Sequence, residues 1–144
     1  MPTDEANKIT FSHLLPGEIP VWRAFLRIYQ NDYDRFEYDV HLGEGSLPQE
    51  APQNIFTENF RYLTLKRADA VGFKGSLPTI FEIRSKASLP LMGQLQGYRF
   101  LWMRSRPDSA PPSLVMICNF MQPDDVDVFE AHDISVVILP FEAR

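Results

Sequence analysis

The chain has 144 residues, 44% of them hydrophobic and 23% charged, which is typical of a globular protein and argues against a large disordered region. We expect a single domain over residues 1–144 that buries a core without a metal, and the lone cysteine excludes an internal disulfide. The net charge of −5 argues against a uniformly basic surface. The polar N-terminus argues against a signal peptide, and no apolar run is long enough to span a membrane. We therefore expect synthesis in a reducing cytoplasm.

The first part of the chain predicts one helix and one strand. Apolar residues recur at helical spacing from Ile19 to Tyr29, which indicates an amphipathic helix that ends near Gln30. Residues 33–42 alternate in the manner of a strand with one polar face, and the residues expected on its apolar face are Phe36, Tyr38, Val40 and Leu42. Prolines and polar residues indicate an irregular connection at residues 46–54.

The rest of the chain alternates predicted strands and helices. Residues 61–73 and 79–86 read as two strands, joined by a Gly-containing loop of hairpin length at residues 74–78. A helix, a buried strand, a short acidic helix and a last buried strand follow, at residues 91–104, 114–120, 124–132 and 134–139. This order predicts an α/β (α+β) fold with a mixed central sheet flanked by helices.

Charge is distributed unevenly along the chain. Residues 1–60 carry 4 Lys/Arg against 10 Asp/Glu, residues 61–106 carry 9 against 2, and residues 107–144 carry 1 against 7. A basic middle third would give one positive face if the fold gathers it on one side. Its only two carboxylates are Asp69 and Glu82, which makes them candidates for a site.

Asp69 and Glu82 fall on the two strands of the predicted hairpin, which can bring both side chains to one ion. Metal-dependent phosphodiester hydrolysis needs oxygen ligands for Mg²⁺ or Mn²⁺ and a cation that orients or activates the attacking water. Alternation along the second strand places Glu82, Arg84 and Lys86 on one face. The hairpin therefore predicts acids and bases side by side.

Three runs, KRADAV at residues 66–71, IFEIRSK at 80–86 and GQLQGY at 93–98, together resemble the core of PD-(D/E)xK nuclease-like proteins of phages and prophages. The resemblance implies a restriction-endonuclease-like αβββαβ core. It also implies that Asp69 and Glu82 are metal ligands and that Gln94 lies over the metal to position water or phosphate. Tyr98, one helical turn later, would share the face of Gln94.

The sequence departs from the family pattern at one position, where Arg84 stands in place of the lysine. Arginine keeps the positive charge but is effectively never deprotonated, and its planar fork differs from an ammonium beside a water. Lys86 could reach back and substitute for it. Alternatively, the nuclease chemistry is lost and the fold persists as a scaffold.

Two functions follow from the resemblance, and a plainer interpretation stands beside them. We favour a weakly active or inactive phage protein that serves in the virion as a head–tail connector or tail component, made in the host cytoplasm. Its partners would be other phage structural proteins and copies of itself, with a DNA contact as a further expectation. The alternative is an active Mg²⁺-dependent DNA endo- or exonuclease that uses Asp69, Glu82, Arg84 or Lys86, and Gln94.

The plainer interpretation is that the two acids only form surface salt bridges, with Arg67, Arg84 or Lys86. A similar choice applies to Trp102, which is either an interface anchor or a core residue.

Overall fold

A five-stranded sheet in the order β1-β2-β3-β4-β5 forms the centre of the structure, which is a computed structural model that describes residues 4–7, 11, 14–43 and 66–140. Neighbouring strands are antiparallel from β1 to β3 and parallel from β3 to β5. The mixed sheet expected from the sequence is confirmed. The strands are β1 (Arg35–Leu42), β2 (Lys66–Lys74), β3 (Leu77–Lys86), β4 (Ser113–Phe120) and β5 (Ile134–Ile138).

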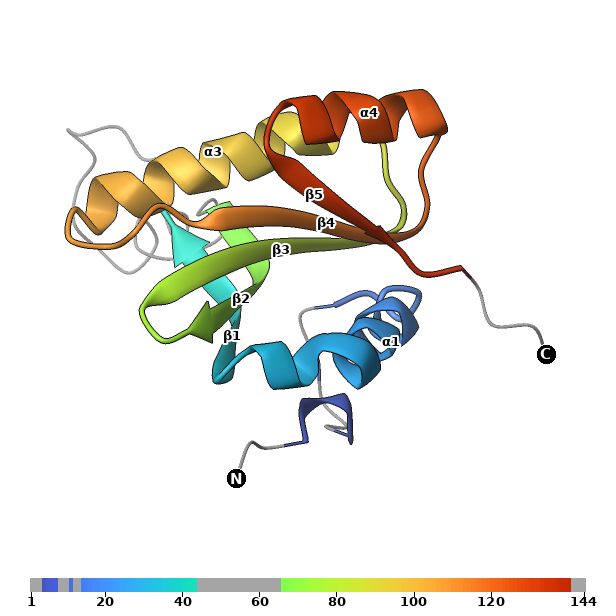
Figure 1. Cartoon of the computed structure of the whole chain (residues 1–144), viewed down its shortest axis with the longest axis horizontal. Coiled ribbons are helices and arrows are strands. Elements are labelled where there is room, and N and C mark those ends of the chain that lie inside the picture. The colour runs from blue at the N-terminus through green and yellow to red at the C-terminus, as the bar shows by residue number, and fades with distance from the viewer. Residues whose placement is uncertain (1–3, 8–10, 12–13, 44–65, 141–144) are drawn as a thin grey trace, which may run out of the picture.

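Helices cover both faces of the sheet (Figure 1). Helix α1 (Ile19–Tyr29) packs on one face, while α3 (Pro90–Ser105) and α4 (Pro123–Ala131) pack on the other. Short 3-10 turns at Glu5–Asn7 (η1) and Gln30–Asp32 (η2) adjoin α1. Strand β4 lies between the two helical layers, which explains why its sequence is an almost continuous apolar run.

Each helical layer encloses its own apolar core. On the α1 side, Trp22 and Phe25 pack against Phe81 of the sheet. On the other side, the core includes Trp102 of α3 and Phe129 of α4. Trp102 is 4% exposed and donates a hydrogen bond from Nε1 to the Ser109 hydroxyl over 3.0 Å, so its interpretation as a core residue is confirmed.

The turn between β2 and β3 is shorter than the sequence predicts. The ladder continues to the pair Lys74 and Leu77, which leaves only two residues outside it. Gly75 has a φ of +59°, and its N–H donates to Oδ2 of Asp34 over 2.6 Å. Pro78 is tolerated inside β3 because β4 begins to pair only at Thr79, so no neighbour on that side needs the missing N–H.

Strand β1 does not keep one apolar face as predicted. Phe36 and Tyr38 pack in the core beneath α1, whereas Val40 and Leu42 pack in the core on the α3 side. The change occurs at Asp39, which has a φ of +51° and interrupts the pairing with β2. A residue in this conformation breaks the period-two alternation on which the prediction depends.

Two sequence predictions lie outside the described residues: the irregular connection at 46–54 and the first part of the strand predicted at 61–73. The described helices include none that combines the length and apolar character needed to cross a bilayer.

Candidate functional site

Strands β2 and β3 pair only near the turn that joins them, and an opening in the sheet separates their other ends. The β2–β3 ladder runs from the pair Lys74 and Leu77 to the pair Ala70 and Phe81 and stops there. Beyond this last pair, the two strands no longer pair with each other, although β2 still pairs with β1 and β3 still pairs with β4. Asp69 and Glu82 are the first residues beyond the last pair, so both predicted acids lie at this opening.

The side chain of Asp69 accepts a hydrogen bond from β3 that a backbone carbonyl of β2 would accept in a regular ladder. Its Oδ2 atom accepts a hydrogen bond from the Ile83 N–H over 2.9 Å and another from Nη1 of Arg84 over 3.2 Å. The carboxylate thereby satisfies a β3 amide that the β2 backbone no longer reaches. The opening is thus held by a side chain and not by the strand ladder.

Glu82 is the most deeply buried ionisable group at the opening, with 1% of its surface exposed. Nη2 of Arg84 lies 2.8 Å from its Oε2, yet neither carboxylate oxygen accepts a well-aligned hydrogen bond from the described residues. Burial, followed by the charge of Asp69, raises the pKa of Glu82 to about 8, although Arg84 acts to lower it. A protonated Glu82 can share its proton with Asp69, and the same hydrogen bond also raises the pKa.

Arg84 contacts three acids of the described chain at the opening. In addition to Asp69 and Glu82, its Nη1 donates to the Ile83 carbonyl over 2.8 Å and lies 3.9 Å from Oε2 of Glu18. Burial lowers the pKa of the Arg84 guanidinium, but the surrounding carboxylates, Glu82 foremost, outweigh burial and raise it. We call Glu18, Asp69, Glu82 and Arg84 the acid–arginine cluster.

Glu18 was not among the residues expected from the sequence. It precedes α1, and its Oε1 accepts a hydrogen bond from the Leu15 N–H over 3.1 Å, which orients the side chain. The only local signal was an acid at a helix start, which is ordinary for helices and does not point to a site. Packing of α1 on the sheet brings it to Arg84.

Helix α3 contributes Tyr98 and not Gln94 to the surroundings of the cluster. Tyr98 is buried, and its pKa is raised first by burial and then by the charges of Glu82 and Asp69. Gln94 is exposed, and no hydrogen bond from it to the cluster is found in the described part of the chain. The two residues therefore do not share one role over the acids.

Lys86 and Arg67 also stand apart from the two acids. Lys86 is exposed at the end of β3 and forms no ion pair with Asp69 or Glu82 in the described structure. Arg67 lies 3.8 Å from the carboxylate of Asp39 on β1. Of the predicted site residues, the structure brings together Asp69, Glu82 and Arg84.

The cluster suits a guanidinium better than a divalent cation. A Mg²⁺ ion needs several ionised or neutral oxygen ligands at about 2.1 Å. Here Arg84 already pairs with both carboxylates, and burial favours the neutral form of Glu82. Within the described ranges, no group of three or more His, Cys, Asp or Glu residues is placed to hold a metal.

Comparisons of the chain with protein-family models, with curated proteins and with solved structures found no match. The functional argument therefore depends on the chemistry of the acid–arginine cluster.

Proposed function

We propose that this chain is a phage protein with a PD-(D/E)xK nuclease-like fold that does not hydrolyse DNA and serves as a structural component of the virion, at the head–tail connector or the tail. The observation that carries the loss of catalysis is the pairing of Arg84 with both Asp69 and Glu82. The order of elements, one helix, three antiparallel strands, a helix and a parallel strand, agrees with the αβββαβ core that the motif resemblance implies.

Arg84 is poorly suited to the work of the missing lysine. Its guanidinium stays protonated and cannot accept a proton from water. It is also engaged already by the Ile83 carbonyl and by both acids. A cation that neutralises the acids internally removes the electrostatic demand for a metal ion, and a protonated Glu82 is a poor ligand.

The assembly role is supported by surface composition. The described chain exposes large apolar side chains, which a protein in a multi-subunit particle can bury against neighbours: Leu15, Ile28, Leu77, Phe100 and Phe120. The acidic ends of the chain suit basic partners, and the basic middle third suits a contact with DNA. Other phage structural proteins and copies of the chain itself are the partners we propose.

The alternative function is a Mg²⁺-dependent DNA endo- or exonuclease, and one observation favours it. Asp69 and Glu82 lie together at a gap in the sheet, and the Arg84 side chain is 30% exposed, so it has room to swing toward solvent. Mg²⁺ or Mn²⁺ would then be held by Asp69 and Glu82, and it would supply charge stabilisation for phosphodiester hydrolysis. Arg84 or Lys86 would contact the phosphate.

A cleavage assay separates the two functions. The purified full chain is incubated with supercoiled plasmid and with linear duplex DNA in Mg²⁺ or Mn²⁺, beside the Asp69→Ala/Glu82→Ala double variant. We expect no cleavage by either protein. Metal-dependent cleavage by the unchanged chain that disappears in the double variant would overturn the non-catalytic proposal and support the nuclease.

The virion role has its own test. We expect the full chain to form a ring or other oligomer in analytical ultracentrifugation, or to sediment with particles purified from its host. A strictly monomeric chain that is absent from particles would contradict the role, whatever the result of the cleavage assay.

A further inference from the structure

Strand β5 leaves one of its two edges unpaired. It is the last strand of the described sheet and pairs only with β4. The Leu139 N–H donates to the Cys118 carbonyl over 2.8 Å, so the backbone of Leu139 faces β4. Because backbone groups alternate in direction along a strand, Ile134, Val136 and Ile138 direct their N–H and C=O groups outward, where the described chain offers them no partner.

The free edge of β5 also lacks the features that usually block strand addition. Its sequence, ISVVI, contains no charged residue and no proline. The opposite edge strand, β1, carries Arg35, Glu37 and Asp39, and the last of these has a positive φ that breaks the regular edge. Of the two edges of the described sheet, the β5 edge is therefore the more open to another strand.

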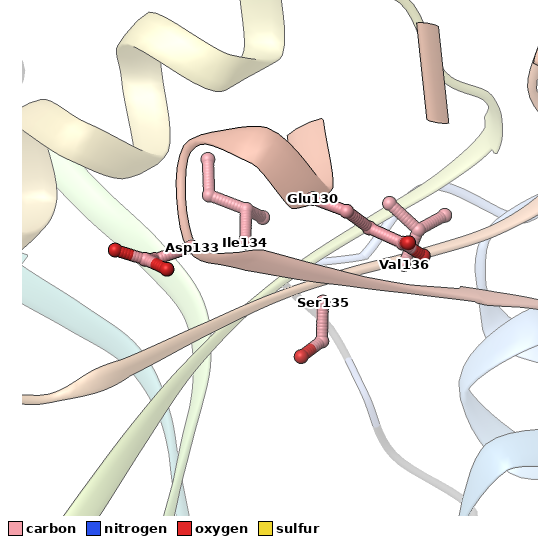
Figure 2. A pocket seen from close by; sticks show the side chains of 5 residues that line it. All are labelled: Glu130, Asp133, Ile134, Ser135 and Val136. Atoms are coloured by element: carbon pink, nitrogen blue, oxygen red, sulfur yellow. The ribbon is translucent and has the colours of Figure 1, made fainter. Parts of the chain in front are cut away.

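A hollow of about 430 Å³ lies beside this edge, and two carboxylates contribute to its lining (Figure 2). Glu130 comes from the end of α4 and Asp133 from the turn that leads into β5, and the other lining residues are Ile134, Ser135 and Val136. Neither carboxylate forms an ion pair within the described ranges. Residues 107–140 contain six Asp/Glu and no Lys/Arg, so this part of the chain is strongly acidic.

We propose that the outer edge of β5 docks an extended, lysine- or arginine-bearing peptide segment of a partner protein. The segment pairs with the outward backbone groups of Val136 and Ile138, and its basic side chains neutralise Glu130 and Asp133. Backbone pairing supplies affinity for any extended peptide, and the two carboxylates select a basic one. The inference goes beyond the proposed function and is independent of the acid–arginine cluster.

A second copy of this chain is a poorer occupant than a basic peptide. Pairing of β5 with β5 across a two-fold axis would bring two copies each of Glu130 and Asp133 to one edge. Since β5 supplies no basic residue to offset them, the like charges would repel. Charge complementarity therefore selects a basic partner.

The test uses the full chain and a short synthetic peptide of alternating lysine and valine. We expect saturable binding, with slower hydrogen exchange of the Val136 and Ile138 amides. The Val137 amide, which faces β4, serves as an internal reference and should change little. The same peptide with N-methylated alternate amides keeps its charge but cannot pair, and it should not bind.

Charge variants of the protein complete the test. Glu130→Gln/Asp133→Asn should weaken peptide binding about tenfold, as expected for the loss of two exposed ion pairs. Asp108→Asn/Asp124→Asn removes the same charge away from the hollow and should leave binding unchanged. Equal binding of the N-methylated peptide, equal binding of a glutamate–valine peptide, or protection of these amides by self-association alone would each overturn the proposal.

Discussion

Nη2 of Arg84 lies 2.8 Å from Oε2 of Glu82, and this contact pairs a half-buried cation with an acid that is 1% exposed. Asp69 and Glu18 contact the same guanidinium, so three carboxyl groups share the positive charge of Arg84. If all three were ionised, the cluster would carry an excess of negative charge away from water. Protonation of Glu82 relieves that excess, and burial first and the charge of Asp69 second raise its pKa to about 8.

The stability of the chain should fall as pH rises between about 4.5 and about 8 because of Glu82. Its folded pKa of about 8 lies above the ordinary value of 4.5, so the folded state binds the proton more tightly than the unfolded state does. The stabilisation is complete below the ordinary pKa and is lost as pH rises through the folded one, at a slope of at most about 1.4 kcal/mol per pH unit.

Chemical denaturation across this pH range measures the effect. Glu82→Gln, which cannot ionise, should flatten the dependence. If the Gln variant shows the same slope as the unchanged chain, another group is responsible and the assignment to Glu82 fails.

Removal of the guanidinium should be costly. Arg84→Ala leaves the buried acids without their cation, and we expect a loss of about 3 kcal/mol in the free energy of unfolding. Arg104→Ala is the matched control because Arg104 is exposed on α3, where its guanidinium lies over the ring of Phe100. The change in its free energy of unfolding should stay within about 0.5 kcal/mol. Similar losses in the two variants would show that Arg84 does not hold the cluster.

Divalent metal should stabilise a variant that lacks Arg84 but not the unchanged chain. In Arg84→Ala, Mn²⁺ or Mg²⁺ can replace the positive charge that Asp69 and Glu82 have lost. A metal concentration of about ten times its Kd would then add about 1.4 kcal/mol. Scanning calorimetry with and without metal measures this, and Asp69→Ala/Arg84→Ala should show no response. A metal-dependent rise in the Tm of the unchanged chain that requires Asp69 would contradict the role of Arg84 as the resident cation.

Two glycine substitutions should have opposite effects. Gly75 has a φ of +59° with open space where a Cβ would stand, so Gly75→Ala is strained only by its backbone and should cost about 1 kcal/mol. Gly93 lies in α3, also with open space, and Gly93→Ala should add about 0.5–1 kcal/mol because alanine restricts the unfolded chain. Urea titrations of both variants give the comparison, and destabilisation by Gly93→Ala would mean that the space is filled.

The sequence predicted the elements well because each depends on local patterns. Helical spacing from Ile19 to Tyr29 and the apolar run of β4 both specify structure without knowledge of distant residues. The hairpin that brings Asp69 near Glu82 is local too. In contrast, the alternation of apolar and polar residues in β1 continues past Asp39 and does not reveal its positive φ. The sequence therefore could not predict that the apolar side chains of β1 change from one face of the sheet to the other.

The cluster itself was less predictable than the strands that carry it. Alternation placed Arg84 and Lys86 on one face, but it could not show that Arg84 turns into the gap while Lys86 remains exposed. Glu18 is far from Asp69 in sequence and meets Arg84 only through packing of α1. The rotation of α3 decides that Tyr98 and not Gln94 is buried, and the weak amphipathic pattern of this helix gave little guidance.

The early end of the β2–β3 ladder also suggests an order of events in folding. Strand pairs beside a two-residue turn form within microseconds. Parallel strands pair more slowly, because a whole helix separates them in the chain. Glu82 lies at the far, open end of this hairpin, and its surroundings are complete only when α1 and α3 have docked. We therefore expect the nascent hairpin to carry a hydrated Glu82 carboxylate that takes up its proton late, so that refolding near neutral pH draws protons from the buffer in its final phase.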